Sequence, residues 1–165
     1  TSKKGQYRIK DNFLAFWFRF VYPMRSFIAS DHPEIAMTKL KTGFIPNHVG
    51  YVYEDICRQK MWELNAQGKL PFLFDRVGRW WGGKDTEIDI VAIDTTDRSK
   101  IIFGECKFHQ NVPMQLSELH QLKEKAAVVP WGNANRDEYF ALFCISGYSE
   151  DLQQLAQEDS HLLLM

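Results

Sequence analysis

The stretch GECKF, residues 104–108, places an acid and an amine at the end of an apolar segment. Glu105 and Lys107 stand two apart, with Cys106 between them. Because strand side chains alternate between the two faces of a sheet, we expect Glu105 and Lys107 on one face and Cys106, a core residue, on the other. The pair suits either an exposed ion pair, which contributes little to stability, or a chemical site.

A second acid, Asp89, lies between Ile88 and Ile90 in another apolar run. A buried carboxylate is costly unless it is paired or binds a cation, and one lysine does not neutralise two acids. Mg²⁺ or Mn²⁺ would neutralise both, because Mg²⁺ favours one or two carboxylates together with water and phosphate oxygens. We therefore predict a phosphodiester-cleavage site in which Asp89 and Glu105 hold the metal. Lys107 would position or help deprotonate the attacking water and stabilise the developing charge.

A third acid, Glu54, belongs to a predicted helix and shares a mostly uncharged strip with Cys57 and Met61. From that strip it could reach over the sheet and become a further metal ligand. The ordinary alternatives are a turn-capping role for Asp89 and a solvated Glu54. Taken together, the order of these acids along the chain favours one shared catalytic site made of Glu54, Asp89, Glu105 and Lys107.

Several residues near the acids are candidates for contacting nucleic acid. Trp80 and Trp81 could stack on bases or on a partner, although aromatics at a strand end commonly pack in or beside the core. The other candidates are Arg76, Arg79, His109 and His120. The five histidines of the chain show no metal-ligand spacing.

One motif suggests a nucleotide site that we do not expect to exist. GRWWGGKD, residues 78–85, matches the G-x-x-x-x-G-K pattern of a phosphate-binding loop. It ends in Asp85 where Ser or Thr is needed, and a strand follows where the phosphate-binding helix should begin. We predict no nucleotide site in this chain.

Composition narrows the class of protein. The 165 residues are 45 % hydrophobic and 25 % charged, with a formal net charge of −1. This is typical of a globular domain and argues against a generally basic nucleic-acid coat, but not against a local site. Cys57, Cys106 and Cys144 are widely spaced, which suits buried thiols in the reducing cytoplasm. The most hydrophobic stretch, residues 13–24, has about half the length that a bilayer requires and contains Arg19, so we expect no membrane span.

The aromatic residues of that stretch recur at helical spacing, which predicts a helix with one face packed on another element. A helix lying on a membrane surface is the alternative. Asp11 or Asn12 would cap this helix and Pro23 would close it. Because the chain does not begin with Met, we expect a piece of a longer protein, with this helix near a domain junction.

The remaining pattern predicts an α/β domain. Gly43 should end a helix over 30–43, and Pro46 should begin another that reaches Gly68. The later elements are predicted as strands 72–81, 87–94 and 100–108, helix 113–129, strand 138–146, helix 149–158 and strand 161–165. The helix between the third and fourth strands implies a parallel crossover and a mixed central sheet covered on both faces. Residues 1–42 are interpreted as a helical linker or extension, and residues 43–165 as the α/β domain.

This order of helix-Glu, strand-Asp and strand-Glu-x-Lys resembles the PD-(D/E)XK nuclease superfamily, which has the restriction-endonuclease-like three-layer fold. The resemblance implies that Asp89 and Glu105 bind Mg²⁺, often with the helix acid Glu54, and that Lys107 is catalytic. Ile88 replaces the Pro that gives the motif its name.

A longer series of motifs, YRIKDNFLAFWFRFVYP, VGRWWG, EIDIVAI and GECK, resembles the C-terminal domain of archaeal-type P-loop ATPases, a domain of unknown function (family 234). The resemblance implies a DNA endonuclease domain at the C-terminus of a cytoplasmic ATPase. The expected partners are DNA, the ATPase domain of the same chain and a second copy. The alternative is a catalytically inactive nuclease-fold module that binds DNA or protein and regulates the ATPase.

Overall fold

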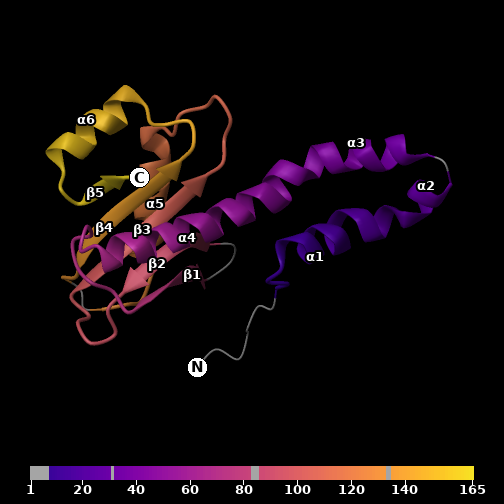
Figure 1. The fold of residues 1–165 in the computed structure, drawn as a ribbon. Coiled ribbons are helices and arrows are strands. Elements are labelled where there is room, and N and C mark those ends of the chain that lie inside the picture. Colours follow the sequence, from indigo (N-terminus) through magenta and orange to yellow (C-terminus); the bar gives the residue numbers. More distant parts are fainter. Residues whose placement is uncertain (1–7, 31, 83–85, 133–134) are drawn as a thin grey trace. The chain divides into compact units, whose positions relative to one another are not determined.

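The computed structural model describes residues 8–30, 32–82, 86–132 and 135–165. Contacts divide the chain into two units, Thr1–Val52 and Tyr53–Met165. The first unit is helical and the second contains the sheet (Figure 1). An α/β domain preceded by a helical N-terminal segment is therefore confirmed, whereas the boundary between residues 42 and 43 stays a prediction.

The N-terminal unit is built on aromatic contacts between its helical segments. Its elements are α1 (Asn12–Phe16), η1 (Trp17–Val21), η2 (Tyr22–Met24), α2 (Arg25–Ala29), α3 (Pro33–Phe44) and η3 (Ile45–Val49). The carboxylate of Asp11 caps α1 by accepting a hydrogen bond from the backbone N–H of Leu14 at 2.8 Å. Phe16 and Phe20 pack edge-on against Phe44, with ring centroids 5.8 and 6.1 Å apart. The predicted aromatic face is thus present and packed. No described helix is long and apolar enough to cross a membrane.

Two predicted helix ends in this unit are wrong. Pro23 does not close the aromatic helix, because a π turn and a 3₁₀ turn carry the chain on to α2. Gly43 and Pro46 do not separate two helices either, since helical residues run from Pro33 to Ala66. Pro46 has no N–H to donate and lies in the π turn of η3, in which the N–H of Gly50 bonds the carbonyl of Ile45.

The C-terminal unit contains one five-stranded mixed sheet (Figure 1). Its strands are β1 (Arg76–Gly82), β2 (Thr86–Ile93), β3 (Lys100–Lys107), β4 (Asp137–Cys144) and β5 (Leu162–Leu164), in that spatial order. The pairs β1–β2 and β2–β3 are antiparallel, and β3–β4 and β4–β5 are parallel. The predicted parallel crossover between the third and fourth strands is confirmed.

Helices cover both faces of this sheet, as predicted. On one face, α5 (Leu116–Ala127) and α6 (Glu150–Glu158) bury Leu119, Leu122 and Leu152 against the strands. On the other, α4 (Gly50–Ala66) buries Cys57 and Met61. The result is a three-layer α/β domain with two apolar clusters, one on each side of the sheet.

The first strand is shorter than the predicted 72–81, because β1 begins only at Arg76. Before it, the side chain of Asn65 on α4 takes the place of a partner strand. Its amide oxygen accepts from the N–H of Phe74 and its amide nitrogen donates to the carbonyl of Phe74, both at 3.0 Å. The buried ring of Phe74 is thereby fixed under α4 without sheet pairing.

Candidate functional site

Asp89 lies at an irregularity of β2. Opposite β1, Gly78 pairs with Val91 but Trp80 pairs with Ile88, so that two residues of β2 face one residue of β1. The alternation of side chains breaks at the same place: Ile88 packs in the α5–α6 cluster and Ile90 in the α4 cluster. Such bulges redirect a side chain, and here the residue redirected is the predicted catalytic acid.

The carboxylate of Asp89 is fixed to the neighbouring strand. Regular pairing between β2 and β3 ends at Ile90 and Gly104. Beyond that pair, Oδ2 of Asp89 accepts a hydrogen bond from the backbone N–H of Cys106 at 2.9 Å. The side chain therefore replaces the next backbone acceptor of the ladder, and Asp89 is held beside Glu105, the residue before Cys106.

Glu105 is buried, with 5 % of its surface exposed, and each of its oxygens has its own ammonium partner. Oε1 lies 2.7 Å from Nζ of Lys107, and Oε2 lies 2.9 Å from Nζ of Lys125. The predicted shared face of Glu105 and Lys107 is confirmed, as is the core position of Cys106 in the opposite cluster. The exposed-pair alternative is wrong. Sequence reasoning missed Lys125, because only the packing of α5 on the sheet brings it here.

Glu54 is also paired rather than solvated. It is held by Arg79 of β1 and lies 3.6 Å from Nη1 of Arg58, and its side chain is 13 % exposed. Nη1 of Arg58 also donates to the backbone carbonyl of Asp89 at 2.9 Å. This contact joins α4 to the bulge, so Glu54 and Asp89 are positioned by one arginine.

The electrostatics of the acids show that they act on one another. Burial, with the negative charges of Glu105 and Glu54, raises the pKa of Asp89 to about 7, against the opposing effects of the Cys106 N–H and Lys107. Burial also raises the pKa of Glu54, although Arg79 and Arg58 oppose it. A carboxyl group that neighbouring acids drive toward protonation is one that a nearby divalent cation would keep ionised.

Burial lowers the pKa of Lys107, but its hydrogen bond to Glu105 and the charges of Glu105 and Asp89 outweigh burial. The pKa of Lys107 is consequently raised above its ordinary value. At neutral pH this amine carries a positive charge, which suits stabilising negative charge better than accepting a proton.

The donor set fits Mg²⁺ or Mn²⁺ through two carboxylates. Asp89 and Glu105 lie on adjacent strands, and hard oxygen ligands combined with water and phosphate are what Mg²⁺ favours. Three or more His, Cys, Asp or Glu side chains do not converge into a ready-made metal cluster anywhere in the described ranges. Glu54 would have to leave Arg79 and Arg58 before it could serve as a third ligand.

The predicted nucleic-acid contacts fall in different environments. Arg79 is engaged by Glu54 and, at 2.8 Å, by Glu87. Trp80 packs against the α5–α6 cluster, whereas Trp81 is 47 % exposed. The remaining predicted contacts are exposed: Arg76, His109 and His120. Of the two tryptophans, Trp81 is therefore the one whose ring is free to stack on a ligand.

The phosphate-loop motif does not form a loop before a helix. Its described part, Gly78–Gly82, lies within β1, and β2 begins at Thr86. Residues 83–85 lie outside the described part of the chain. A strand in place of the helix N-terminus removes the backbone donors that a nucleotide phosphate needs.

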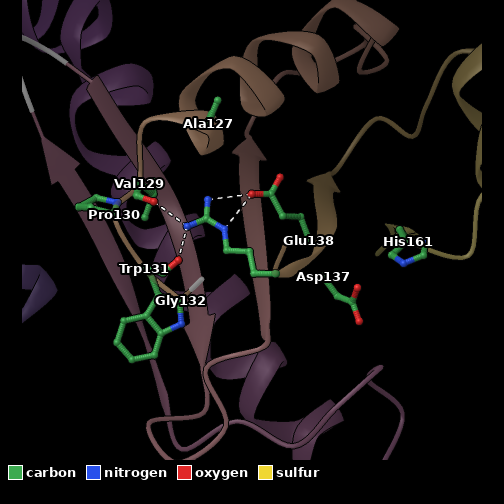
Figure 2. Close-up of a pocket in the computed structure, with 9 residues that line it drawn as sticks. Ala127, Val129, Pro130, Trp131, Gly132, Asp137, Glu138 and His161 are labelled. Carbon is green, nitrogen blue, oxygen red and sulfur yellow. Dashed lines mark hydrogen bonds and ion pairs between the residues drawn. The ribbon is translucent and has the colours of Figure 1, made fainter. Parts of the chain in front are cut away.

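A separate pocket opens at the other end of the parallel strands, where β4 begins (Figure 2). Arg136 is the positively charged residue at the centre of this pocket, and its guanidinium is engaged by other groups of the protein. The guanidinium donates to the carboxylate of Glu138 and to the carbonyls of Ala126, Val129 and Trp131. Arg136 therefore clamps the chain that leaves α5, and its guanidinium is already engaged within the protein. Among the described residues that line the pocket, the buried indole N–H of Trp131 has no hydrogen-bond partner.

Comparison with known sequences gives a family and one relative. The family described as archaeal and bacterial proteins of unknown function matches residues 17–126. An uncharacterized protein of Methanocaldococcus jannaschii is 34 % identical over 142 residues, which cover 86 % of this chain and 31 % of the relative. The chain thus spans about a third of the length of this curated relative. No solved structure matches the chain significantly.

Proposed function

This chain belongs to the family of archaeal and bacterial proteins of unknown function called domain of unknown function 234, and we propose that it is a Mg²⁺- or Mn²⁺-dependent DNA endonuclease domain of PD-(D/E)XK type. The observation that carries the proposal is the meeting of Asp89 and Glu105 on adjacent strands. Asp89 is bonded to the residue that follows Glu105, and Lys107 is bonded to Glu105 itself. Two carboxylates can hold a divalent ion, and an amine can stabilise the negative charge that develops at phosphorus, so this set suits metal-assisted phosphodiester hydrolysis.

Asp89 and Glu105 would hold the metal ion, with Glu54 as an outer or additional ligand. The bound ion would supply Lewis acidity at the phosphoryl oxygen and lower the pKa of a coordinated water. Lys107, held in its charged form by Glu105, would orient the attacking water and stabilise negative charge on the phosphorus centre. The bulge in β2 keeps the Asp89 carboxylate in place while this occurs.

The partners we propose are DNA and the rest of a longer chain. A net charge of −1 gives little general affinity for DNA, so binding energy would come from a region outside this chain. We propose that this region is an ATPase domain, in a cytoplasmic protein whose buried thiols remain reduced.

The exposed aromatic residues of the N-terminal unit suit contact with that ATPase region or with a second copy. They are Phe13, Trp17, Phe18, Tyr22 and Tyr51. If residues 1–25 are disordered in the longer protein, as hydrogen exchange would reveal, this docking role is wrong.

One observation favours a second candidate function. Glu105 is already balanced by two lysines and Glu54 by two arginines. A nuclease fold whose acids are satisfied by its own cations could be a catalytically inactive module that binds DNA or protein and regulates the ATPase.

The experiment that tests the proposal uses the longer natural chain and this domain side by side. Each is incubated with single-stranded, duplex and branched DNA in Mg²⁺, Mn²⁺ or EDTA. We expect metal-dependent cleavage that Asp89→Asn, Glu105→Gln and Lys107→Met each abolish. Glu63→Gln, an exposed acid on the same helix as Glu54, is the matched control and should cleave normally.

Metal binding separates the two candidate functions. Isothermal titration with Mn²⁺ should show a site in the wild type that Asp89→Asn and Glu105→Gln weaken strongly. If the wild type binds no metal, cuts none of the DNA forms, and behaves like its variants in DNA binding, the nuclease proposal is wrong. The regulatory module then takes its place.

A further inference from the structure

Lys125 is a charged residue of the candidate site that comes from a separate layer of the fold. It stands in the last turn of α5, and its ammonium lies 2.9 Å from Oε2 of the buried Glu105. The other oxygen of Glu105 is taken by Lys107 at 2.7 Å. Both oxygens of this carboxylate are therefore paired with ammonium groups.

We propose that Lys125 is the counter-ion of the metal-free site and a positioning residue of the metal-bound one. It occupies the place on Glu105 that a divalent cation takes, and it moves to the phosphate of the nucleic acid when the cation binds. This inference rests on the proposed nuclease function. It adds a residue and a mechanism by which the empty site stays folded and the loaded site gains a phosphate contact.

If a divalent cation binds Glu105, the charges around this carboxylate favour the departure of one of its two ammonium partners. A divalent ion on the same carboxylate would face two ammonium groups at contact distance, in a region where burial weakens screening. Such repulsion subtracts from metal affinity until one group withdraws. The phosphate of a bound substrate brings negative charge that can receive the ammonium that leaves.

Lys125, rather than Lys107, is the residue able to withdraw. Lys107 is carried on β3 only two residues from Glu105, so its backbone is fixed relative to the carboxylate. The two lysine side chains are equally exposed, at 29 % and 30 %, but Lys125 reaches Glu105 from another element, so its backbone is not tied to the carboxylate. Its head can swing into water or onto a ligand without any movement of the sheet.

Lysine ammonium groups and a divalent cation would compete for the carboxylate of Glu105, and the neighbouring acids do not relieve this competition. Asp89 accepts only one hydrogen bond from β3, the backbone N–H of Cys106, and Glu54 is paired with arginines from α4 and β1. Glu105 is therefore the acid at which lysines and metal must compete directly. Replacing Lys125 should change metal affinity in the direction opposite to replacing a ligand.

The test compares Lys125→Met with Lys123→Met in the full chain. Lys123 lies on the same helix and its ammonium sits 5.2 Å from the centre of the Phe140 ring, so the control loses the same charge elsewhere. Isothermal titration with Mn²⁺ should show that Lys125→Met binds the ion roughly threefold to tenfold more tightly than the wild type. Lys123→Met should match the wild type.

A second readout is thermal unfolding with and without metal. Without Mn²⁺, Lys125→Met should unfold a few degrees below the wild type, because a buried carboxylate has lost one partner. With saturating Mn²⁺ this difference should disappear. Cleavage of DNA by the loaded variant should fall, since the phosphate contact is lost, which separates tighter metal binding from better catalysis.

The outcomes distinguish this inference from the proposed function. If the wild type binds Mn²⁺ and Lys125→Met binds it equally or less tightly, the counter-ion role is wrong while the nuclease proposal stands. If only Lys125→Met binds Mn²⁺, the counter-ion role is supported and the wild type is the inactive module. If neither protein binds Mn²⁺, both the counter-ion role and the metal-dependent activity are overturned.

Discussion

The side chain of Asp89 and the backbone of Cys106 are joined by a 2.9 Å hydrogen bond that replaces the last rung between β2 and β3. The bond holds a carboxylate next to Glu105 at the place where the two strands separate. The same carboxyl group has a pKa raised to about 7 by burial and by the charges of Glu105 and Glu54. The hydrogen bond thus places Asp89 where the charge of Glu105 helps to raise its pKa.

The first prediction concerns stability and pH in the absence of metal. The pKa of Asp89 is about 7 in the folded protein against an ordinary value of 3.8, so the folded state holds the proton more tightly. Its contribution to stability is present below pH 4 and is lost as the pH rises to 7. Asp89→Asn keeps an oxygen for the Cys106 N–H but does not ionise. Relative to the wild type it should gain stability between pH 5 and 8, by up to about 1.4 kcal/mol per unit.

Urea unfolding in EDTA at these two pH values measures the difference. Asp75→Asn is the control, because the hydrogen bonds from Thr95 lower the pKa of Asp75. Asp75 contributes stability that is lost only as the pH falls through its lowered pKa, so the stability difference between Asp75→Asn and the wild type should be the same at pH 5 and at pH 8. A wild type and Asp89→Asn that differ equally at both pH values would show that Asp89 is ionised throughout.

The second prediction concerns metal and protons. A carboxylate must be deprotonated to bind a divalent cation. Since Asp89 is mostly protonated below pH 7, Mn²⁺ binding should weaken as the pH falls from 8 to 6 and should release about one proton at pH 6. Titration calorimetry in two buffers with different ionisation enthalpies counts that proton. Equal heats in both buffers at pH 6 would mean that the ion binds without Asp89.

The third prediction concerns Gly104, the residue before the buried acid. A Cβ at this position would lie 2.9 Å from Cβ of Ile90 and 3.1 Å from the carbonyl oxygen of Ala141. These contacts are with neighbouring strands on both sides, so neither can yield cheaply. Gly104→Ala should cost about 1–3 kcal/mol in urea unfolding. Gly78→Ala is a matched control in β1, where a Cβ meets nothing within 4 Å and stability should be unchanged or slightly increased.

The fourth prediction concerns Arg136 at the far end of β4. Its side chain is 9 % exposed, and it bonds Glu138 and three carbonyls of the chain that leaves α5. Arg136→Ala should lower the free energy of unfolding by about 3–5 kcal/mol, because it leaves a carboxylate and those carbonyls without their donor. Arg136→Lys keeps the charge but loses the planar guanidinium. Its free energy of unfolding should lie between those of the wild type and Arg136→Ala.

Thermal unfolding and urea titration measure both Arg136 variants. Arg76→Ala, an exposed arginine at the start of β1, should change stability by no more than about 0.5 kcal/mol. A small effect of Arg136→Ala would mean that water replaces the guanidinium at the end of α5. The clamp interpretation of the pocket in Figure 2 would then be wrong.

The relative placement of Glu105, Cys106 and Lys107 could be predicted from the sequence, because it depends on the alternation of side chains along one strand. Strand alternation is sufficient to place Glu105 and Lys107 together and Cys106 opposite, and the structure confirms this placement. The helix between two apolar strands is likewise sufficient to predict the parallel pair β3–β4. Patterns of this kind are set by neighbours in the chain, which a sequence displays directly.

The contact of Lys125 with the site could not be predicted from the sequence, because it depends on how the helices pack on the sheet. Lys125 follows the buried Leu122 by three residues on α5, which is the signal that could have placed it beside the apolar face. Its contact with Glu105 depends on the rotation of α5 against the sheet. The bulge at Asp89 also depends on the pairing of β1 with β2, whose register shifts between Gly78 and Trp80. No residue type in the sequence marks that shift.

The last prediction concerns Glu54 and Arg79, which join α4 to β1. Both side chains are largely buried, at 13 % and 18 % exposure, so their interaction is weakly screened by water. A double-mutant cycle with Glu54→Gln and Arg79→Gln should give a coupling energy of about 1–3 kcal/mol. The cycle subtracts the separate contact of Arg79 with Glu87. Lys60 and Glu63 are an exposed pair on the same helix, and their cycle should give a much smaller coupling energy, because water screens the pair.

Repeating the Glu54–Arg79 cycle in saturating Mn²⁺ tests whether Glu54 joins the metal. A ligand cannot keep its full pairing with an arginine, so the coupling energy should shrink if Glu54 turns toward the ion. An unchanged coupling would assign Glu54 to holding α4 on the sheet. The metal would then be held by Asp89 and Glu105 alone.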